Sequence, residues 1–327
     1  MGKGLDIGTV NLVAAQQDDG GKTIVRKQRN AFIDIPVDPY QKNMLTRLKV
    51  PYVIQGTKMY VLGDAAFELA NVLNRNTRRP MREGMLSPKE SDALPVMKLL
   101  IENILGKARA EGEPCFFSVP GEPIDSTLNV VYHRDVFESV LKGFGYVPTH
   151  INEGHAVVIA ELADEEFTGI GISCGGGMFN VCVSYKSMPA LAFSTSRGGD
   201  WIDTNVSNVL GIKSARATLI KEKGVDVALP NNREEEAIGI YYRNLINYTI
   251  TIIKERFESS EGMPTFPEPV ALVCSGGTAM IGGFQKLVEE ELRKINFPIP
   301  IKDVRIAKDP LNAVARGCLL MAMSEQG

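Results

Sequence analysis

Three short glycine-rich segments carry residue types that could hold phosphate oxygens. They are Asp6-Ile7-Gly8-Thr9, Cys174-Gly175-Gly176-Gly177-Met178 and Ser275-Gly276-Gly277-Thr278. Glycine lets a backbone turn tightly and approach a ligand closely, and successive N–H groups in such turns bind anions. The segments therefore predict phosphate binding, with Thr9 adding a hydroxyl donor. Taken alone, each segment is a weak signal that is also compatible with an ordinary tight turn.

Two acidic residues are candidates for chemistry beside a phosphate. Asp6 precedes the first glycine turn, where its carboxylate could orient water molecules around Mg²⁺, an ion that keeps most of its water shell. Glu153 begins an expected helix, where its carboxylate could polarise a water molecule and accept its proton. The alternative for Asp6 is capping of the turn, and the alternative for Glu153 is capping of the helix.

Apolar stretches must position these segments, and two of the stretches repeat one pattern. Residues 4–15, broken near Gly8, lead through a Gly-Gly turn to 23–25, which predicts a hairpin. A second hairpin is predicted from 168–174 and 178–185. The third glycine segment follows an expected strand over 270–274, and the carboxyl end of a strand is where α/β sheets bind ligands.

The rest of the chain alternates expected strands with expected helices. Short strands are predicted over 51–54, 59–62 and 115–119, and helices over 64–73, 89–105, 126–144, 153–162, 237–258 and 283–294. This alternation is typical of α/β proteins. Because a strand–glycine turn–strand unit recurs near residues 8 and 175, we expect a duplicated protein with two lobes.

Composition excludes several classes of protein. With 44% hydrophobic and 23% charged residues among 327, the chain is typical of a globular rather than a disordered protein. Lys plus Arg number 36 against 39 Asp plus Glu, so we expect no direct nucleic-acid partner. Five cysteines without a Cys-x-x-Cys pair suit a reducing compartment. Because no apolar run reaches about 18 residues, we expect a cytoplasmic protein.

The glycine segments gain specificity from their order along the chain together with three further motifs. These motifs are Ile151-Asn152-Glu153-Gly154, the run Arg197-Gly198-Gly199-Asp200-Trp201-Ile202-Asp203, and the run Asp309-Pro310-Leu311-Asn312-Ala313-Val314-Ala315-Arg316-Gly317. In this order, the motifs resemble the actin, heat-shock chaperone and sugar-kinase ATPase superfamily over nearly the whole chain. The segments 79–84, 198–200 and 309–311 are most similar to MreB-type bacterial actins, with MamK-like filament proteins as near relatives.

The resemblance implies a two-lobed, duplicated α/β actin-like ATPase fold with a nucleotide cleft between the lobes. The first lobe is expected over 1–150, with a small insertion at about 31–75 and a C-terminal helix over 309–327 that completes it. The second lobe is expected over 151–308, with a helical insertion at about 207–265. The implied cofactors are ATP or ADP with Mg²⁺.

The resemblance also assigns roles to residues that match the superfamily motifs. It places Glu153 and Asp6 in catalysis, with Asp6 holding Mg²⁺ through water and Ser173 as a weak further metal ligand. The residues implied to bind nucleotide are Gly8, Thr9, Val10, Asn11, Gly175, Gly176, Gly177, Met178, Gly199, Asp200, Lys221, Glu222, Gly276, Gly277 and Thr278.

Three positions depart from the superfamily pattern. Ser173 stands where an Asp usually precedes the second glycine turn, Gly154 replaces a usual Pro, and Asn180 stands where a Glu is common. Backbone amides can still bind a nucleotide, but one negative charge is lost near the metal. The sequence therefore predicts nucleotide binding more strongly than efficient hydrolysis.

The leading functional hypothesis is an actin-like cytoskeletal ATPase that polymerises into filaments, with hydrolysis destabilising the filament. The alternatives are a monomeric chaperone-like ATP-binding regulator, a small-molecule kinase of the same superfamily, and a nucleotide-binding member with degenerate ATPase activity.

Residues 22–82 carry 12 Lys or Arg against four acids, a local charge of +8. This region is either a solvated face or a surface for an acidic partner or a membrane-associated adaptor.

Overall fold

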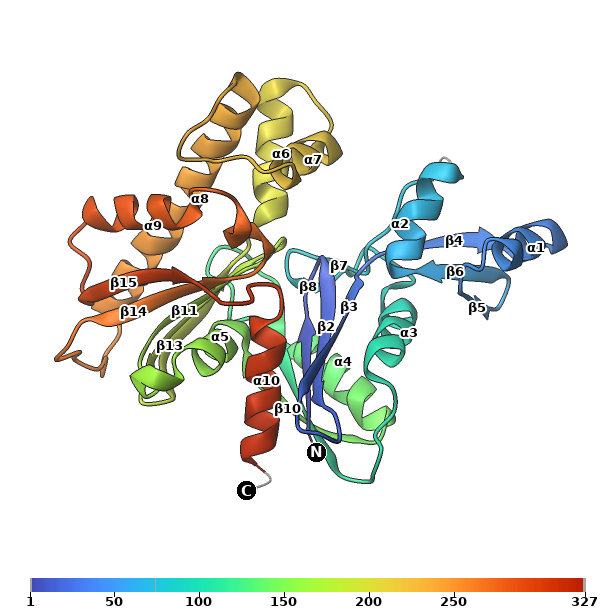
Figure 1. The fold of residues 1–327 in the computed structure, drawn as a ribbon, viewed down its shortest axis with the longest axis horizontal. Helices are drawn as coiled ribbons and strands as arrows, with labels where there is room; N and C mark the ends of the chain where they lie inside the picture. The colour runs from blue at the N-terminus through green and yellow to red at the C-terminus, as the bar shows by residue number, and fades with distance from the viewer. Residues whose placement is uncertain (1, 74, 326–327) are drawn as a thin grey trace.

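Two five-stranded sheets form the centres of two lobes, and helix α10 (Ala313–Ser324) stands between them (Figure 1). This computed structural model describes residues 2–73 and 75–325, without the side chain of Asn71. The last two residues of the C-terminal helix expected over 309–327 therefore lie outside the described residues. Helix α10 begins at Ala313, four residues after the expected start.

The first sheet combines a hairpin with two parallel strands. Its order is β10-β9-β1-β2-β3, in which β1 pairs antiparallel with β2 and parallel with β9. The strands are β1 (Lys3–Ile7), β2 (Asn11–Gln17), β3 (Thr23–Arg29), β9 (Glu113–Val119) and β10 (Tyr146–Asn152). Helices α3 (Ala93–Leu105) and α4 (Val130–Gly143) contribute apolar side chains to the core of this lobe.

The second sheet repeats the pairing of the first. Its order is β13-β12-β11-β14-β15, and β11 pairs antiparallel with β12 and parallel with β14. The strands are β11 (Gly169–Cys174), β12 (Phe179–Tyr185), β13 (Met188–Thr195), β14 (Val270–Ser275) and β15 (Ile301–Ile306). Its helices are α6 (Gly199–Leu210), α7 (Ser214–Glu222), α8 (Arg233–Ser259) and α9 (Phe284–Arg293). The predicted two-lobed, duplicated α/β fold is thereby confirmed.

Helices α5 (Glu153–Glu161) and α10 pack against each other between the two sheets. Helix α10 contacts β1, β2 and β9 of the first sheet, and α5 contacts β11 and β12 of the second. The helices approach so closely that a Cβ on Gly317 would lie 2.0 Å from the carbonyl oxygen of Ala156. A Cβ on Gly4 would lie 2.2 Å from the carbonyl oxygen of Ala315. Glycine at both positions thus lets the two lobes share one helical layer.

A small insertion extends from the first lobe and has a core of its own. It contains β4 (Phe32–Pro36), α1 (Pro39–Arg47), β5 (Tyr52–Gln55), β6 (Lys58–Leu62) and α2 (Gly63–Val72). Its strands form a separate sheet in the order β4-β6-β5. Buried side chains such as Ile33, Leu45 and Leu69 fill the space between this sheet and its helices. The two-stranded ribbon of β7 (Met81–Arg82) and β8 (Met85–Leu86) follows.

Most predicted elements are present, but some of their ends differ. The helix expected over 126–144 begins at Val130, because Asn129 caps it by accepting a hydrogen bond from the Tyr132 N–H. Asp125, just before the expected start of this helix, accepts hydrogen bonds from the Ser196 N–H and the Tyr248 hydroxyl. These bonds tie the segment before α4 to the second lobe.

The contact between α5 and α10 predicts a large effect of adding one methyl group. Gly317→Ala should lower the free energy of unfolding by about 1–3 kcal/mol, because the new Cβ would overlap the Ala156 carbonyl. Gly143→Ala is the matched control, since an added Cβ at this exposed helical position meets nothing within 4 Å. Urea unfolding of both variants measures the difference. Equal stabilities would contradict the close packing.

Candidate functional site

The three predicted glycine turns follow the carboxyl ends of β1, β11 and β14. In the first turn, the Gly8 N–H donates to the Asn11 carbonyl at 3.1 Å, and a Cβ on Gly8 would lie 2.6 Å from the same oxygen. Asn30, directly after β3, fixes this turn, because its side-chain amide donates to the Gly8 carbonyl at 2.9 Å. The tight backbone of the first turn therefore requires the glycine that the sequence supplies.

The second turn lies against the first. A Cβ on Gly176 would be 2.4 Å from Val10 Cγ2, and one on Gly177 would be 2.4 Å from Thr9 Oγ1. Thr9 Oγ1 also accepts a hydrogen bond from the Gly84 N–H at 3.0 Å, which brings the loop between β7 and β8 to the same place. Turns separated by more than 150 positions in the sequence thus meet directly between the lobes.

Met178 completes this contact between the lobes. The residue belongs to the second turn, but it is buried beside Met85 and Val130 of the first lobe. A Cβ on Gly84 would lie 2.3 Å from its sulfur. The tip of the second turn is therefore packed into the first lobe by an apolar side chain.

The third turn contacts the second turn from the side of β14. Thr278, in the short helix η2 (Gly277–Met280), donates a hydrogen bond from Oγ1 to the Gly175 carbonyl at 2.9 Å. Gly276 has a φ of 92°, and a Cβ there would lie 2.4 Å from the Cys174 carbonyl oxygen. All three predicted glycine turns are therefore brought together.

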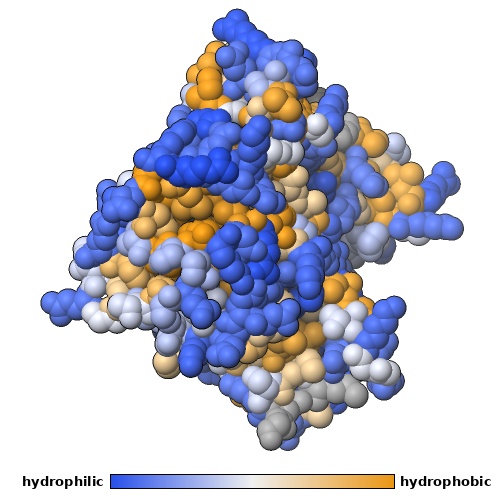
Figure 2. Space-filling model, turned by 60° about the vertical axis from the view of Figure 1, so that its left-hand side comes forward, coloured by the Kyte–Doolittle hydropathy of each residue, from blue (hydrophilic) through white to orange (hydrophobic). Residues whose placement is uncertain are grey.

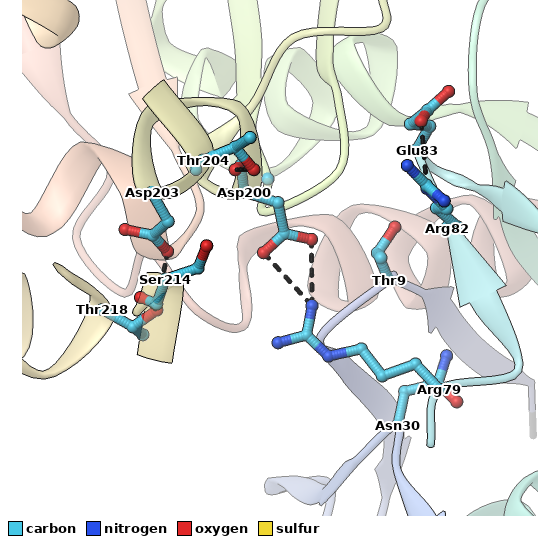
Figure 3. Close-up of polar contacts among 12 residues, drawn as sticks. Thr9, Asn30, Arg79, Arg82, Glu83, Asp200, Asp203, Thr204, Ser214 and Thr218 are labelled. Carbon is cyan, nitrogen blue, oxygen red and sulfur yellow. Dashed lines mark hydrogen bonds and ion pairs between the residues drawn. The ribbon is translucent and has the colours of Figure 1, made fainter. Parts of the chain in front are cut away.

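The N-terminus of α6 closes the same cluster. The Gly199 and Asp200 N–H groups donate to the carbonyls of Gly175 and Gly176 at 3.1 and 2.8 Å. The Asp200 carboxylate faces the Arg79 guanidinium of the first lobe (Figure 3). Predicted residues Gly199 and Asp200 therefore lie directly on the second turn.

Lys221 joins this cluster, whereas Glu222 does not. The Lys221 ammonium donates to the Gly199 carbonyl at 3.0 Å and pairs with the Asp203 carboxylate at 2.8 Å. Asp203 also accepts a hydrogen bond from the Thr218 hydroxyl (Figure 3). Glu222 is the exposed last residue of α7, and among the described residues no hydrogen bond joins it to the other predicted ligands.

Glu153 begins α5 and is buried below the turns. Asn152 caps the helix by accepting a hydrogen bond from the His155 N–H. The Ser173 hydroxyl donates to Glu153 Oε2 at 2.9 Å. Burial and, to a smaller extent, the nearby Asp6 carboxylate raise the pKa of Glu153 to about 8, against the lowering effect of hydrogen bonds with Ser173 and Asn180. A carboxyl group with such a pKa can exchange protons near neutral pH.

Asp6 is the second carboxyl group of the site. Burial raises the pKa of Asp6 to about 6, while a hydrogen bond from the Ser118 hydroxyl at 3.0 Å lowers it. Ser118 lies on β9, and its hydroxyl also accepts a bond from the Ile7 N–H at 3.0 Å. Asp6 and Glu153 thus form a pair of acids with separated pKa values, as acid–base sites do.

The donor set suits a magnesium ion held mainly by phosphate oxygens. No group of three or more His, Cys, Asp or Glu able to hold a metal occurs among residues 2–73 and 75–325. Mg²⁺ is commonly bound through one or two carboxylates together with substrate phosphates and water. Asp6 could meet that requirement through water, whereas Ser173, the other expected metal ligand, uses its hydroxyl proton for Glu153.

Two of the departures from the superfamily pattern have structural explanations. The backbone of α5 lies so close to β12 that a Cβ on Gly154 would be 2.6 Å from the Cys182 nitrogen. Gly154 is therefore needed by the packing of this helix on the sheet. The Asn180 side chain accepts a hydrogen bond from the Gly121 N–H at 3.0 Å, a bond between the lobes.

A cavity of about 680 Å³ lies beyond the third turn, between η2, α9 and the segment after β15. Figure 2 brings the second lobe forward and shows apolar surface beneath a hydrophilic ridge on it. The lining includes Met280, Ile281, Phe284, Ile306 and Pro310. The volume falls in the range of small-molecule sites.

Several residues of the site were absent from the predicted ligands. Arg79, Ser118 and Asp203 each contact a predicted residue directly. Ser118 is the second-last residue of the strand predicted over 115–119, and a hydroxyl near the carboxyl end of a strand was a usable signal. Asp203 belongs to a motif that the sequence already singles out. The approach of Arg79 to Asp200 has no local signal, because it depends on how the lobes pack.

A match to a family model shows the family of this chain. A family model for volactin matches residues 1–322. The chain belongs to the volactin family. No curated protein matches this volactin-family sequence.

Solved structures share the fold of this volactin at low sequence identity. A MamK double helical filament is 19% identical, with 98% of each chain covered and a TM-score of 0.76. MreB 5 of Spiroplasma citri bound to AMPPNP is 15% identical, with 99% of this chain and 96% of that chain covered and a TM-score of 0.70. The ethanolamine utilization protein EutJ from Carboxydothermus hydrogenoformans is 18% identical, with 98% and 89% coverage and a TM-score of 0.56. These matches confirm the predicted resemblance to MreB-type and MamK-type actins.

A helix that crosses a bilayer must be long and predominantly apolar. Across the part of the chain that the structure describes, no helix is both long enough and apolar enough to cross a membrane.

The raised pKa of Glu153 predicts a pH-dependent stability. The folded state favours the protonated Glu153 carboxyl group. The contribution of this group to the free energy of unfolding is therefore fully present below about pH 4.5 and is lost as the pH rises through about 8. Glu153→Gln should therefore be more stable than the wild type at pH 8.5, by roughly 1–4 kcal/mol at about 1.4 kcal/mol per pKa unit. The difference should vanish near pH 4.5.

Thermal unfolding from pH 4.5 to 8.5 checks this prediction. Glu102→Gln, at an exposed position of α3, is the control for a change of side-chain charge. A pH-independent difference between Glu153→Gln and the wild type would show that Glu153 is charged in the folded state.

Proposed function

We propose that this volactin binds ATP between its lobes and assembles into filaments. The observation that carries the proposal is a set of unpaired backbone donors where the first two glycine turns meet. The N–H groups of Thr9, Val10, Gly176 and Gly177 have no hydrogen-bond acceptor within the described chain. Buried N–H groups almost always have a partner, and Thr9 and Gly177 are buried. A polyphosphate would supply the missing acceptors.

The two lobes would hold different parts of the nucleotide. Thr9, Val10, Gly176 and Gly177 would bind phosphate oxygens from both sides. The third turn, Lys221 and the apolar cavity lined by Met280 and Ile281 would receive the nucleoside. Two structures with this fold, MreB 5 of Spiroplasma citri and a non-polymerising MamK mutant, are bound to AMPPNP. They support the choice of an adenine nucleotide.

Glu153 is the proposed base for hydrolysis. Magnesium, when bound with the phosphates, would neutralise charge that develops on them. In its ionised form Glu153 would accept a proton from a water molecule, and its raised pKa makes this carboxylate a stronger base than an ordinary glutamate. Asp6 would hold water in the metal shell, and Ser118 would keep its carboxylate oriented.

Filament assembly is supported by the fold and by exposed apolar side chains. A MamK chain with the same fold forms a double helical filament. In this volactin, Tyr40, Leu48 and Ile54 of the insertion are exposed, as are Leu229 and Ile240 of the second lobe. These exposed apolar side chains are candidates for contacts between subunits, and one repeated contact that does not close a ring gives a filament.

The basic region over 22–82 has a more limited role in this proposal than the sequence suggests. Arg29, Lys58, Arg78 and Arg79 form ion pairs with acidic side chains. An acidic partner or a membrane-associated adaptor would therefore meet the remaining cations of β3 and α1. Such a partner, the cytoplasmic location and the lobe boundaries at residues 150 and 308 remain proposals.

A second candidate is a nucleotide-binding volactin with degenerate ATPase activity. The observation that favours it is Ser173, whose hydroxyl donates to Glu153 and so occupies the proposed base. The loss of an Asp at this position also removes one negative charge beside the metal. This candidate shares the proposed nucleotide binding and differs in turnover alone.

Nucleotide binding should depend on the contact between the first two turns. Gly177→Ala should weaken AMPPNP binding at least about tenfold, a loss of about 1.4 kcal/mol, because the added Cβ would overlap the Gly84 nitrogen and Thr9 Oγ1. Gly20→Ala, in the turn at the opposite end of β2, is the control. Isothermal titration calorimetry with Mg²⁺ measures both affinities. Equal affinities would contradict binding at these turns.

Turnover and assembly should separate at Glu153. Glu153→Ala should lower ATP hydrolysis about 10²–10⁴-fold, while filaments still form with ATP and Mg²⁺ in negative-stain electron microscopy.

Phosphate release by Ser173→Asp decides between the two candidates. A gain of more than about tenfold over the wild type supports the degenerate ATPase, and brisk wild-type turnover rejects it. Glu153→Ala with unchanged turnover would remove Glu153 from the mechanism.

A further inference from the structure

An ion pair between Arg79 and Asp200 spans the two lobes. Arg79 lies just before β7, and Asp200 is the second residue of α6, 121 positions later. One guanidinium nitrogen, Nη1, lies 2.9 Å from Oδ2 and 3.1 Å from Oδ1 of the carboxylate (Figure 3). The pair borders a cavity of about 280 Å³ that Arg82 and Lys89 also line, so solvent and ions reach it.

The backbone beside Arg79 is fixed to the first lobe. The Arg78 N–H and carbonyl form hydrogen bonds with Phe32 at 2.8 and 2.9 Å. The Arg78 guanidinium pairs with Asp34, Glu90 and Asp92 and lies over the Phe32 ring. On the other side, the Pro80 carbonyl accepts a bond from the Ser87 N–H. The backbone on both sides of Arg79 is therefore held to the first lobe, and the Arg79 side chain extends from it to Asp200 of the second lobe.

Asp200 is fixed to the second glycine turn. Its N–H donates to the Gly176 carbonyl at 2.8 Å, and the preceding Gly199 N–H donates to the Gly175 carbonyl at 3.1 Å. A force on the Asp200 side chain therefore acts on the turn that carries two of the unpaired donors. The ion pair connects that turn to the first lobe in addition to the apolar contact of Met178.

The strength of the pair follows from its exposure. The side chains of Arg79 and Asp200 are 41% and 43% exposed. Exposed pairs of this kind change an equilibrium constant by up to about fivefold, and salt weakens them. The pair can therefore bias the lobes toward the closed arrangement without locking them in it.

We propose that Arg79 and Asp200 form a reversible clasp that holds the second glycine turn against the first lobe and slows the release of bound nucleotide. The effect on release rests on the proposed nucleotide binding, whereas the effect on the turn does not. Arg79 acts here as a positioning residue, because it works through Asp200. Arg82 lines the same cavity, but it forms an ion pair with its neighbour Glu83.

Hydrogen exchange of the nucleotide-free protein tests the clasp directly. Arg79→Gln and Asp200→Asn should speed exchange of the hydrogen-bonded amides of Gly175, Gly199 and Asp200 about two- to fivefold. Arg82→Gln is the matched control, because it removes the same charge from the same cavity. The reversed pair, Arg79→Asp with Asp200→Arg, should restore slow exchange. In 1 M NaCl the wild type should approach the two variants.

Nucleotide release tests the functional consequence. Stopped-flow displacement of an N-methylanthraniloyl ATP analogue should be about two- to fivefold faster for Arg79→Gln and Asp200→Asn than for the wild type. The double variant Arg79→Gln/Asp200→Asn should match the single variants, because all three lose the same interaction. Arg82→Gln should release the analogue at the wild-type rate.

Specific outcomes would overturn the clasp. Equal acceleration by Arg79→Gln and Arg82→Gln would indicate a general charge effect, and additive effects in the double variant would show that Arg79 and Asp200 act separately. Unchanged hydrogen exchange in Arg79→Gln and Asp200→Asn would show that the ion pair does not hold the second turn. If the wild type fails to bind the analogue, the proposed function fails, while hydrogen exchange still decides whether the clasp exists.

Discussion

The close approach of α5 and α10 is the constraint on which the rest of the structure depends. Gly317 lets α10 lie against the Ala156 carbonyl, Gly4 lets β1 lie against α10, and Gly154 lets α5 lie against β12. Because these contacts involve backbone atoms, they leave little freedom for the sheets to shift or tilt. The carboxyl ends of β1 and β11 consequently meet, and their turns contact each other through Val10 and Gly176. The site is a result of helix packing as much as of its own residues.

Burial below the turns gives the acidic residues their special character. Glu153 is buried and Asp6 is partly buried by the same packing, and the pKa of each is raised. Ser173 supplies a neutral hydrogen bond where the superfamily pattern has a carboxylate. A further carboxylate at this depth would be expensive without a bound cation. The substitution therefore suits a site that must stay folded without ligand, and it lowers the charge available for a metal.

Local sequence signals predicted much of the fold and rather less of the site. Both hairpins and the third glycine turn were predictable because alternating apolar residues and glycines act over a few positions. Strands β4 and β13 and the start of α6 lacked such signals. The bonds from Ser118 to Asp6 and from Arg79 to Asp200 join residues 112 and 121 positions apart. They follow from packing of the lobes, which no short motif encodes. The binding and catalytic roles given to the site residues remain predictions.

Met178 gives the contact between the lobes a particular mechanical quality. Its unbranched side chain has several rotatable bonds and a polarizable sulfur, and it packs against Met85 and Val130. Methionine fills irregular space and adjusts to small displacements better than a branched side chain does. The second turn can therefore shift slightly against the first lobe without opening a void, although the backbone contacts of α5 and α10 restrain the sheets. The contact between the lobes is thus adjustable at the tip of the turn and rigid at the helices.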